Sequence, residues 1–267
     1  MPGLIVDLDG TVYLGERLIP GADSALARLR AAGHRIVFAT NKSVARPKDY
    51  VEKLAAMGIP ASLDELVTVN EVLARHLRKR FGPGQRVLVV GEAPLHDELA
   101  AAGLSTTTRW DRADAVAMGW DRDLHYSAFN AAFQAARQGA YVAATNPDAT
   151  CPTEEGELPD CGAQIAALEA ALGREVDAVV GKPSVTMALA STAKLGLPPE
   201  RCWMVGDRVN TDVRMANEAG LSSALLLSGV AAPEEAAEGP WRPDRVCADL
   251  AEFTDWFLEE HPEGPAA

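Results

Sequence analysis

The sequence predicts an α/β protein in which a parallel-sheet core carries an inserted, smaller α/β domain. Short runs of Val, Ile and Leu alternate with segments of helical spacing along the chain. The apolar runs are continuous, which is typical of parallel strands covered by helices on both faces. A break rich in Gly and Pro, FGPG at 81–84, divides the pattern, and a second series of strands and helices follows it.

The first part of the chain alternates strands with helices. Apolar residues recur at helical spacing from Gly21 to Ala32, and Gly33 ends that pattern. Pro47 begins the next helix and Gly58 follows its end. In chain order we expect strand 4–7, helix 21–32, strand 35–39, helix 47–57 and a helix capped by Asn70 that runs to Arg80.

The same alternation continues beyond residue 84. The run RVLVVG at 86–91 is typical of a buried strand, and Ser184 can cap a later helix. We expect strands at 86–91, 113–119, 140–144, 178–180, 202–205 and 224–227, and helices at 94–102, 127–138, 163–172, 184–194 and 211–219. From this order we assign residues 1–81 and 179–267 to the core and residues 82–178 to the inserted domain.

The composition is that of a globular protein without a nucleic-acid partner. The chain has 267 residues, a net charge of −13 and 48% hydrophobic residues, enough to bury a sizeable core. A short basic run, Arg78 to Arg80, falls at the end of an expected helix, where the helix dipole favours cations. No apolar stretch is long enough for a signal peptide or a membrane span, so we expect no membrane partner.

The cysteines indicate a reduced compartment. They lie far apart and form no C-x-x-C pair: Cys151, Cys161, Cys202 and Cys247. We therefore expect neither a zinc site nor a disulfide framework, and a cytoplasmic location fits best.

Polar residues mark the ends of three apolar runs. Asp7, Thr40 and Asp207 each stand where such a run ends. Ligands bind beyond the carboxyl ends of parallel strands, so neighbouring strands would bring these residues to one edge of the sheet. With Asp9 and Lys182 nearby, that edge would hold three carboxylates, a hydroxyl and a lysine.

This set of side chains suits attack on a phosphate ester. A carboxylate such as Asp7 is a competent nucleophile at neutral pH and needs no base to activate it. The carboxyl of Asp9 can protonate the leaving alkoxide and later accept a proton from water. Gly10 permits a sharp turn that brings backbone N–H groups towards the anion, and Thr40 with Asn41 can hold its remaining oxygens.

The clustered carboxylates need cations beside them, because they would otherwise repel an anionic substrate. Lys182 supplies one positive charge. A hard divalent ion with oxygen ligands would supply more, and this ligand set favours Mg²⁺ over Zn²⁺. The ion would orient the phosphoryl oxygens and offset developing charge.

Each motif also has a simpler interpretation. Asp-Gly is a common turn signal, and D-x-D-G-T could open a calcium loop, but Leu18 stands where an EF-hand needs Glu. Gly181 and Lys182 do not end a Walker A loop, because Pro183 replaces Ser or Thr. Lys182 could be a surface residue, and Asp212 a charge at a helix N-terminus. These interpretations do not explain why all the motifs occur together at strand ends.

Several segments resemble the signature motifs of a known superfamily. Four of them resemble the four signatures of the haloacid dehalogenase superfamily and occur in the same order. They are DLDGT at 7–11, ATN at 39–41, GKPS at 181–184 and GDRVNTD at 206–212. The segments ATNPD at 144–148 and LSG at 227–229 resemble its NagD-like, p-nitrophenylphosphatase-like branch with a type IIA cap. The resemblance covers nearly the whole chain and implies a Rossmann-like core with a mobile α/β cap between the second and third motifs.

The resemblance also implies roles for individual residues. Asp7 would be the nucleophile, Asp9 the general acid/base, and Thr40 and Lys182 would bind the phosphoryl group. The implied Mg²⁺ positions are Asp7, the backbone carbonyl of Asp9, Asp207 and, in support of the metal shell, Asp212. The implied phosphate- and substrate-binding positions are Gly10, Thr11, Thr40, Asn41, Lys182 and, on the cap, Asn146, Pro147 and Asp148.

We therefore expect a Mg²⁺-dependent phosphatase for small monoesters such as sugar phosphates, nucleotides, phosphoglycolate or p-nitrophenyl phosphate. Lys42 and Asn210 depart from the branch's usual residues and bear on substrate choice. Two alternatives on the same fold are a non-catalytic module that binds phosphometabolites and a phosphomutase that keeps the acyl phosphate from water. A pure binder would not need Asp9. Because caps of this branch often pair, a homodimer is a further expectation.

Overall fold

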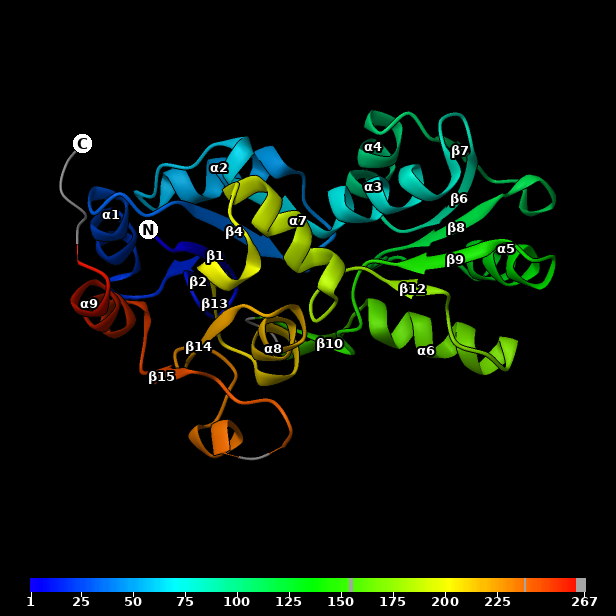
Figure 1. The fold of residues 1–267 in the computed structure, drawn as a ribbon. Helices are drawn as coiled ribbons and strands as arrows, with labels where there is room; N and C mark the ends of the chain where they lie inside the picture. The colour runs from blue at the N-terminus through cyan, green and yellow to red at the C-terminus, as the bar shows by residue number, and fades with distance from the viewer. Residues whose placement is uncertain (154–155, 238, 263–267) are drawn as a thin grey trace. The chain divides into compact units, whose positions relative to one another are not determined.

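The computed structural model describes residues 1–153, 156–237 and 239–262 and forms two compact units (Figure 1). The first unit contains Met1–Thr40, Pro47–Val67 and the chain from Lys182 onward. The second contains Asn41–Arg46 and Thr68–Gly181. Each unit is built on a parallel sheet with helices packed against it, which confirms the predicted α/β class.

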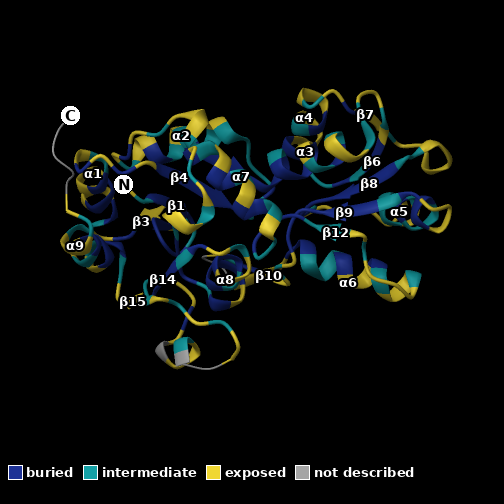
Figure 2. Ribbon diagram, in the orientation of Figure 1, coloured by how far each residue is buried: buried dark blue, intermediate teal, exposed yellow. Residues whose placement is uncertain are grey.

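The first unit has a six-stranded sheet at its centre. Its strands are β1 (Gly3–Asp7), β4 (Ile36–Thr40), β5 (Leu66–Thr68), β13 (Cys202–Gly206), β14 (Ser222–Leu226) and β15 (Arg245–Cys247), in the spatial order β15-β14-β13-β1-β4-β5. β1 pairs in parallel with β13 and β4, and β14 pairs in parallel with β13 and β15. All residues of β1 and β4 are buried, as expected for strands covered on both faces (Figure 2).

Helices pack on both sides of this sheet. They are α1 (Ala22–Ala31), α2 (Pro47–Ala56), α7 (Val185–Leu195), α8 (Arg214–Ala219) and α9 (Leu250–Glu260). α1 packs against α9 and α7 against α8, with strand β1 between the two pairs (Figure 1). Ser184 caps α7, as predicted, by accepting a hydrogen bond from Thr186 N at 3.2 Å. Asp249 caps α9 in the same way through Glu252 N at 2.9 Å.

The second unit has a five-stranded parallel sheet. Its strands are β6 (Arg86–Val90), β7 (Ser105–Thr107), β8 (Ala115–Met118), β9 (Tyr141–Ala144) and β12 (Ala178–Val179), in the order β12-β9-β8-β6-β7. Its helices are α3 (Val69–Phe81), α4 (Ala93–Ala101), α5 (Tyr126–Arg137) and α6 (Cys161–Leu172). α3 packs against α4, and α5 against α6, on opposite sides of this sheet (Figure 1).

The boundary between the units differs from the predicted one, because α3 belongs to the second unit rather than to a core of residues 1–81. The apolar side of α3 packs against α4 and β9, and His76 Nε2 lies 3.0 Å from Tyr141 Oη. Thr68, not Asn70, caps the helix through Glu71 N.

The segment Asn41–Arg46 also belongs to the second unit. Asn70 Nδ2 donates to the backbone oxygen of Ser43 at 2.8 Å. Trp120 N donates to Ser43 Oγ at 2.9 Å. These bonds hold a segment that the sequence analysis assigned to the core.

Several short strands and one helix were not predicted. They are the hairpin of β2 (Tyr13–Leu14) and β3 (Arg17–Leu18), the hairpin of β10 (Thr150–Thr153) and β11 (Gly156–Pro159), the strands β5, β7 and β15, and helix α9. The strands among these elements have two to four residues, which are too few to show a periodic pattern, whereas α9 has 11 residues. Within the described ranges, no helix combines the length and the apolar character needed to cross a membrane.

Candidate active site

Three predicted site residues reach one edge of the first unit's sheet. Asp7 ends β1, Thr40 ends the neighbouring β4, and Asp207 follows β13 on the other side of β1. Because these strands are parallel neighbours, their carboxyl ends share an edge, as the apolar runs predicted. All three residues are buried.

Lys182 lies between two carboxylates. Its Nζ is 2.7 Å from Asp7 Oδ1 and 2.7 Å from Asp212 Oδ1, and its side chain is 3% exposed. Burial alone lowers the pKa of Lys182, but the charges of Asp212 and Asp7 and their hydrogen bonds raise it above its usual value. The ammonium is therefore charged at neutral pH and pairs with two acids.

Asp207 adds a third carboxylate to this group. One oxygen each of Asp7, Asp207 and Asp212 lie within 4.8 Å of one another. Burial, with the charge of Asp212, raises the pKa of Asp207 to about 6. Burial also raises the pKa of Asp7 well above its usual value; Lys182 opposes this rise, and Asp212 and Asp207 add to it. Three buried acids thus lie together while Lys182 pairs with two of them, and this favours a further cation.

Two glycine loops pack directly against Asp207. A Cβ atom would lie 2.3 Å from Asp207 Oδ2 at Gly10 and 2.0 Å from it at Gly229. Ser228 Oγ joins the loops by donating to the backbone oxygen of Gly10 at 2.9 Å. Val230 N donates to Asp207 Oδ2 at 2.8 Å, whereas Asp207 Oδ1 has no hydrogen-bond partner within the described part of the chain.

A π-helical turn, Val209–Val213, orients Asp212 towards the lysine. Arg208 N donates to Asp212 Oδ2 at 3.1 Å, which leaves Oδ1 to pair with Lys182. A Cβ atom at Gly206 would lie 2.3 Å from Asp212 Cγ, so the strand end must be glycine for the carboxylate to fit.

The turn after β1 contains the remaining residues of the first motif. Gly10 N donates to the backbone oxygen of Tyr13 at 2.8 Å, and Asp9 forms an isolated bridge with Tyr13. Asp9 is half-buried. Thr11 is fully buried, and its Oγ1 has no hydrogen-bond partner among the described residues.

Three predicted substrate-binding residues meet within the second unit. Asn41 Nδ2 donates to Asp148 Oδ2 at 2.8 Å. Asn146 Nδ2 donates to the same oxygen at 2.9 Å. Pro147, which lies between Asn146 and Asp148 in the sequence, is exposed.

Asp160, which the sequence analysis did not single out, contacts the same loop. Asn146 Nδ2 donates to Asp160 Oδ1 at 3.3 Å, and the Asp160 side chain also caps α6 by accepting from Cys161 N. Burial raises the pKa of Asp160, and the charge of Asp148 adds to the rise. An Asp directly before an apolar helix is a capping signal, but no periodic pattern could reveal its contact with Asn146.

Known proteins resemble this chain over most of its length. A family profile described as haloacid dehalogenase-like hydrolase matches residues 4–105, and a HAD-hydrolase-like profile matches residues 179–253. The sugar-phosphatase AraL of Bacillus subtilis is 35% identical over 252 residues, which cover 94% of this chain and 92% of the relative. The chain belongs to the haloacid dehalogenase-like hydrolases.

Solved structures resemble this haloacid dehalogenase-like hydrolase closely. The 4-nitrophenylphosphatase of Thermotoga maritima aligns with a TM-score of 0.90 at 37% identity, over 96% of this chain and 97% of that one. The glycerol phosphate phosphatase of Mycobacterium tuberculosis, solved in complex with magnesium, aligns with a TM-score of 0.88 at 36% identity, over 94% and 75% of the two chains. These likenesses agree with the NagD-like branch predicted from the sequence.

The hydrolase's first unit also has residues at the site to which the sequence analysis gave no role. Ser228 and Gly229 follow β14, so the rule that ligands bind beyond strand ends applies to them as it does to Asp7. In the sequence, their segment is marked only by its resemblance to the NagD-like branch.

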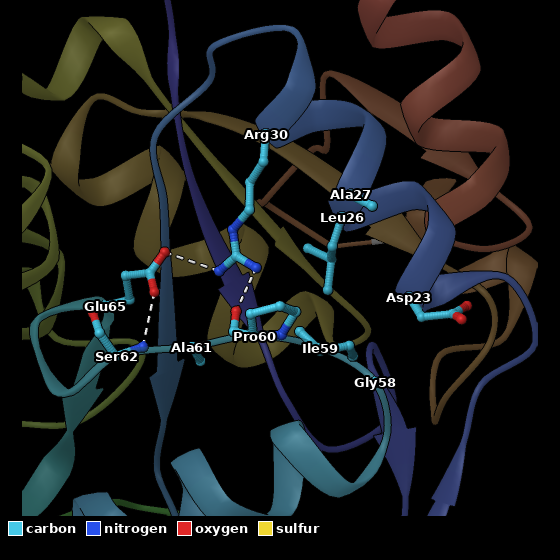
Figure 3. A pocket seen from close by; sticks show the side chains of 10 residues that line it. All are labelled: Asp23, Leu26, Ala27, Arg30, Gly58, Ile59, Pro60, Ala61, Ser62 and Glu65. Atoms are coloured by element: carbon cyan, nitrogen blue, oxygen red, sulfur yellow. Dashed lines mark hydrogen bonds and ion pairs between the residues drawn. The ribbon is translucent and has the colours of Figure 1, made fainter.

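A pocket elsewhere in the hydrolase's first unit contains none of the clustered acids. It has a volume of about 550 Å³ and lies along α1 and the loop before β5 (Figure 3). Arg30 donates to the Pro60 backbone oxygen at 2.5 Å and to Glu65 at 2.8 Å, and Glu65 accepts from Ser62 N at 2.9 Å. The loop enters the amino end of β5, whereas the acids follow carboxyl ends. The pocket is therefore not part of the candidate active site.

Proposed function

We propose that this hydrolase is a Mg²⁺-dependent phosphatase that cleaves small phosphate monoesters through a phosphorylated Asp7. Its similarity to a sugar-phosphatase and a 4-nitrophenylphosphatase supports a phosphoric monoester hydrolase. The observation that carries the proposal is the position of Lys182 between Asp7 and Asp212, with Asp207 beside them. This arrangement combines a nucleophile, a fixed cation and surplus negative charge at the carboxyl edge of the sheet.

The acid cluster fits Mg²⁺. Its donors are carboxylate oxygens, which suit a hard ion, and Asp207 Oδ1 is buried without a hydrogen-bond partner among the described residues. Asp7 and Asp207 would hold the ion with the backbone carbonyl of Asp9, and Asp212 would support this group. When bound, Mg²⁺ would orient the phosphoryl oxygens and offset their negative charge. The magnesium complex of the glycerol phosphate phosphatase supports this assignment.

Asp7 would attack phosphorus through one of its oxygens. Its Oδ1 accepts from Leu8 N at 2.7 Å and pairs with Lys182 at 2.7 Å, which fixes the carboxylate. Oδ2 would form the new bond to phosphorus while the ester P–O bond breaks. The products of this step would be an acyl phosphate on Asp7 and the alkoxide of the leaving group. Lys182, Thr40 and Asn41 would bind the phosphoryl oxygens.

Asp9 would move the protons. Its carboxyl would protonate the leaving alkoxide, which departs as an alcohol. Asp9, now ionised, would accept a proton from the water that attacks the acyl phosphate. That second step would release inorganic phosphate and restore the Asp7 carboxylate.

The second unit would act as the cap that selects the leaving group. Asp148, which Asn41 and Asn146 hold in place, supports this role, because a carboxylate suits a hydroxylated leaving group. The substrates named for the relatives support small sugar or polyol phosphates. The homodimer and the cytoplasmic location stay predictions.

Turnover of p-nitrophenyl phosphate tests the proposal. We expect hydrolysis that requires Mg²⁺ and is suppressed by EDTA. Asp7→Asn should lower kcat by at least about 1,000-fold, because no covalent intermediate can form. Retained turnover in this variant would remove the covalent mechanism. A wild-type protein that is inactive with Mg²⁺ on a panel of phosphate monoesters would remove the phosphatase itself.

The role of Asp9 is tested by changing the leaving group. Asp9→Asn should slow an alkyl phosphate such as glycerol phosphate by about 100-fold or more. It should slow p-nitrophenyl phosphate less, because the nitrophenolate needs no proton to leave. Equal losses on both substrates would contradict the general-acid role.

A further inference from the structure

We propose that Asp160 is a positioning residue for phosphate binding, because it fixes Asn41 through Asn146 and Asp148. This inference rests on the proposed function, in which Asn41 and the preceding Thr40 hold the phosphoryl oxygens. Asn41 and its three supports all belong to the second unit. Asp160 would act only through the other side chains.

Asn146 connects two carboxylates and has no amide hydrogen left for a ligand. A primary amide has two N–H groups. Asn146 Nδ2 donates to Asp148 Oδ2 at 2.9 Å and to Asp160 Oδ1 at 3.3 Å, and its Oδ1 accepts from Thr145 Oγ1 at 2.7 Å. The residue is 2% exposed. Asn146 therefore holds the loop together. The resemblance of its motif had implied contact with the ester instead.

Asp148 connects Asn146 to Asn41 by hydrogen bonds. Its Oδ2 accepts from Asn146 on one side and from Asn41 Nδ2, at 2.8 Å, on the other. A carboxylate oxygen that accepts two amide N–H groups gives both amides a defined position, because charge-assisted bonds are short and strong. The hydrogen bonds thus run from Asp160 through Asn146 and Asp148 to Asn41.

Helix α6 anchors the Asp160 end of this series of hydrogen bonds. Asp160 is buried and caps α6, so its carboxylate is fixed to the first turn of that helix. Gly162 N donates to the Asp148 backbone oxygen at 2.8 Å. A Cβ atom at Gly162 would lie 2.2 Å from the Pro147 backbone oxygen, so only glycine permits this approach. The helix end is therefore the support on which the loop is formed.

The consequence for catalysis follows from the position of Asn41 in the chain. It is bonded to Thr40, which ends β4 at the edge where the acids lie. A misplacement of about 1 Å in a binding group can cost up to about 100-fold in rate. We expect a smaller effect, about tenfold in kcat/KM, because Asp160 acts at a distance from the reacting atoms.

Three variants separate positioning from helix capping. Asp160→Ala removes both the cap of α6 and the bond to Asn146. Asp249→Ala is the matched control, because Asp249 caps α9 through Glu252 N and has no place in the binding site. Asp160→Asn keeps an oxygen that can accept the same two bonds.

Turnover of p-nitrophenyl phosphate with Mg²⁺ and thermal melting are measured on all three. Both alanine variants should lower Tm by similar amounts, since a lost cap costs about 1 kcal/mol. Only Asp160→Ala should lower kcat/KM, by about tenfold and mainly through KM, because Asp7 is untouched. Asp160→Asn should recover most of that loss. Equal kcat/KM in Asp160→Ala and Asp249→Ala would overturn the proposal.

A double-mutant cycle tests the proposed series of bonds. Asp160→Ala combined with Asn41→Ala should lose little more kcat/KM than Asn41→Ala alone, because both changes remove the same contribution. Fully additive losses would mean that Asp160 does not act through Asn41 and would overturn the proposal.

Amide hydrogen exchange tests the positioning role of Asp160 without measuring catalysis. Exchange at Asn41 and Lys42 should rise in Asp160→Ala and stay at the wild-type rate in Asp249→Ala. Unchanged exchange at both residues would overturn the positioning role, whatever the activity of the enzyme. Raised exchange in a protein whose wild type hydrolyses no phosphate monoester would instead support the positioning of Asn41 and count against the proposed function.

Discussion

Lys182 and its two acids depend on one another because all three side chains are buried. The ammonium lies 2.7 Å from an oxygen of each acid. Removing it would take the ammonium partner from two buried carboxylates, and breaking a buried pair in this way costs about 3 kcal/mol or more. We expect Lys182→Met to lose about this much stability in metal-free urea denaturation.

A surface ion pair provides the comparison. Arg28 lies 2.6 Å from Asp255, and both side chains are at least half exposed. Arg28→Met should therefore cost less than about 1 kcal/mol. If Lys182→Met lost no more stability than Arg28→Met, Asp7 and Asp212 would have to relieve their mutual repulsion by taking up protons.

Asp207 should make the stability of the metal-free protein depend on pH. Its folded pKa is raised from 3.8 to about 6. Between these values the folded state holds the proton more tightly than the unfolded state does. Stability should therefore fall as the pH rises from about 4 to 6, by up to about 3 kcal/mol, and level off above that. Urea denaturation across this range should show the fall, and Asp207→Asn should flatten it. If Asp207→Asn kept the dependence of stability on pH, the proton bound by the folded state would belong to Asp7.

At the scale of single residues, the sequence predicted the strand-end positions well and the pairings poorly. Asp7, Thr40 and Asp207 could be placed at one edge because the ends of apolar runs can be read directly. The pairing of Asp212 with Lys182 depends on the π-helical turn Val209–Val213, whereas an ordinary helix beginning at residue 211 was predicted. The sequence carries no periodic signal for one inserted residue in a helical turn.

The loop between β1 and β2 can be tested through its glycine. Gly10 has φ +85°, and a Cβ atom there would meet Asp207 Oδ2 at 2.3 Å. Gly58 has φ +78° and open space around it, so Gly58→Ala has the same backbone strain without the collision. Both alanine variants should lose about 1 kcal/mol from the left-handed backbone. Only Gly10→Ala should also weaken Mg²⁺ binding, by about tenfold or more, because Asp207 must move.

Titration of Mg²⁺ against activity measures this difference. The half-saturating Mg²⁺ concentration should rise in Gly10→Ala and stay at the wild-type value in Gly58→Ala. Equal values in the two variants would mean that the packing of the loop against Asp207 does not shape the metal site.

At the scale of elements, most periodic segments were predicted, with helix α9 as an exception, and their partners were not. The predicted helix ending at Arg80 exists as α3, but its membership of the second unit depends on packing against α4 and β9. Those contacts join residues far apart in the chain. A change in composition at 81–84 therefore marked the end of an element and not the boundary between the units.

Mg²⁺ should stabilise the whole protein if it binds the acid cluster. A ligand that binds only the folded state adds about 2.7 kcal/mol of stability at 100 times its Kd. We expect Tm to rise with added Mg²⁺ and to return to its metal-free value with EDTA. The rise should be absent in Asp207→Asn. A rise of wild-type size in that variant would show that the ion binds at another site.

At the scale of the whole molecule, the sequence predicted an inserted domain but not how often the chain passes between the units. The second unit takes Asn41–Arg46 before the long insertion at Thr68–Gly181. A six-residue segment is too short to show a hydrophobic pattern of its own. Its assignment depends on bonds to residues much later in the chain.

Chimeras within the family would therefore need two grafts. Ser43 accepts hydrogen bonds from Trp120 N and from Asn70 Nδ2, so the hexapeptide 41–46 and the fragment 68–181 are fitted to each other. Transplanting only the long fragment from another member would set its donors against a foreign hexapeptide. If the second unit selects the leaving group, as proposed, exchange of substrate preference between members would require moving both pieces together.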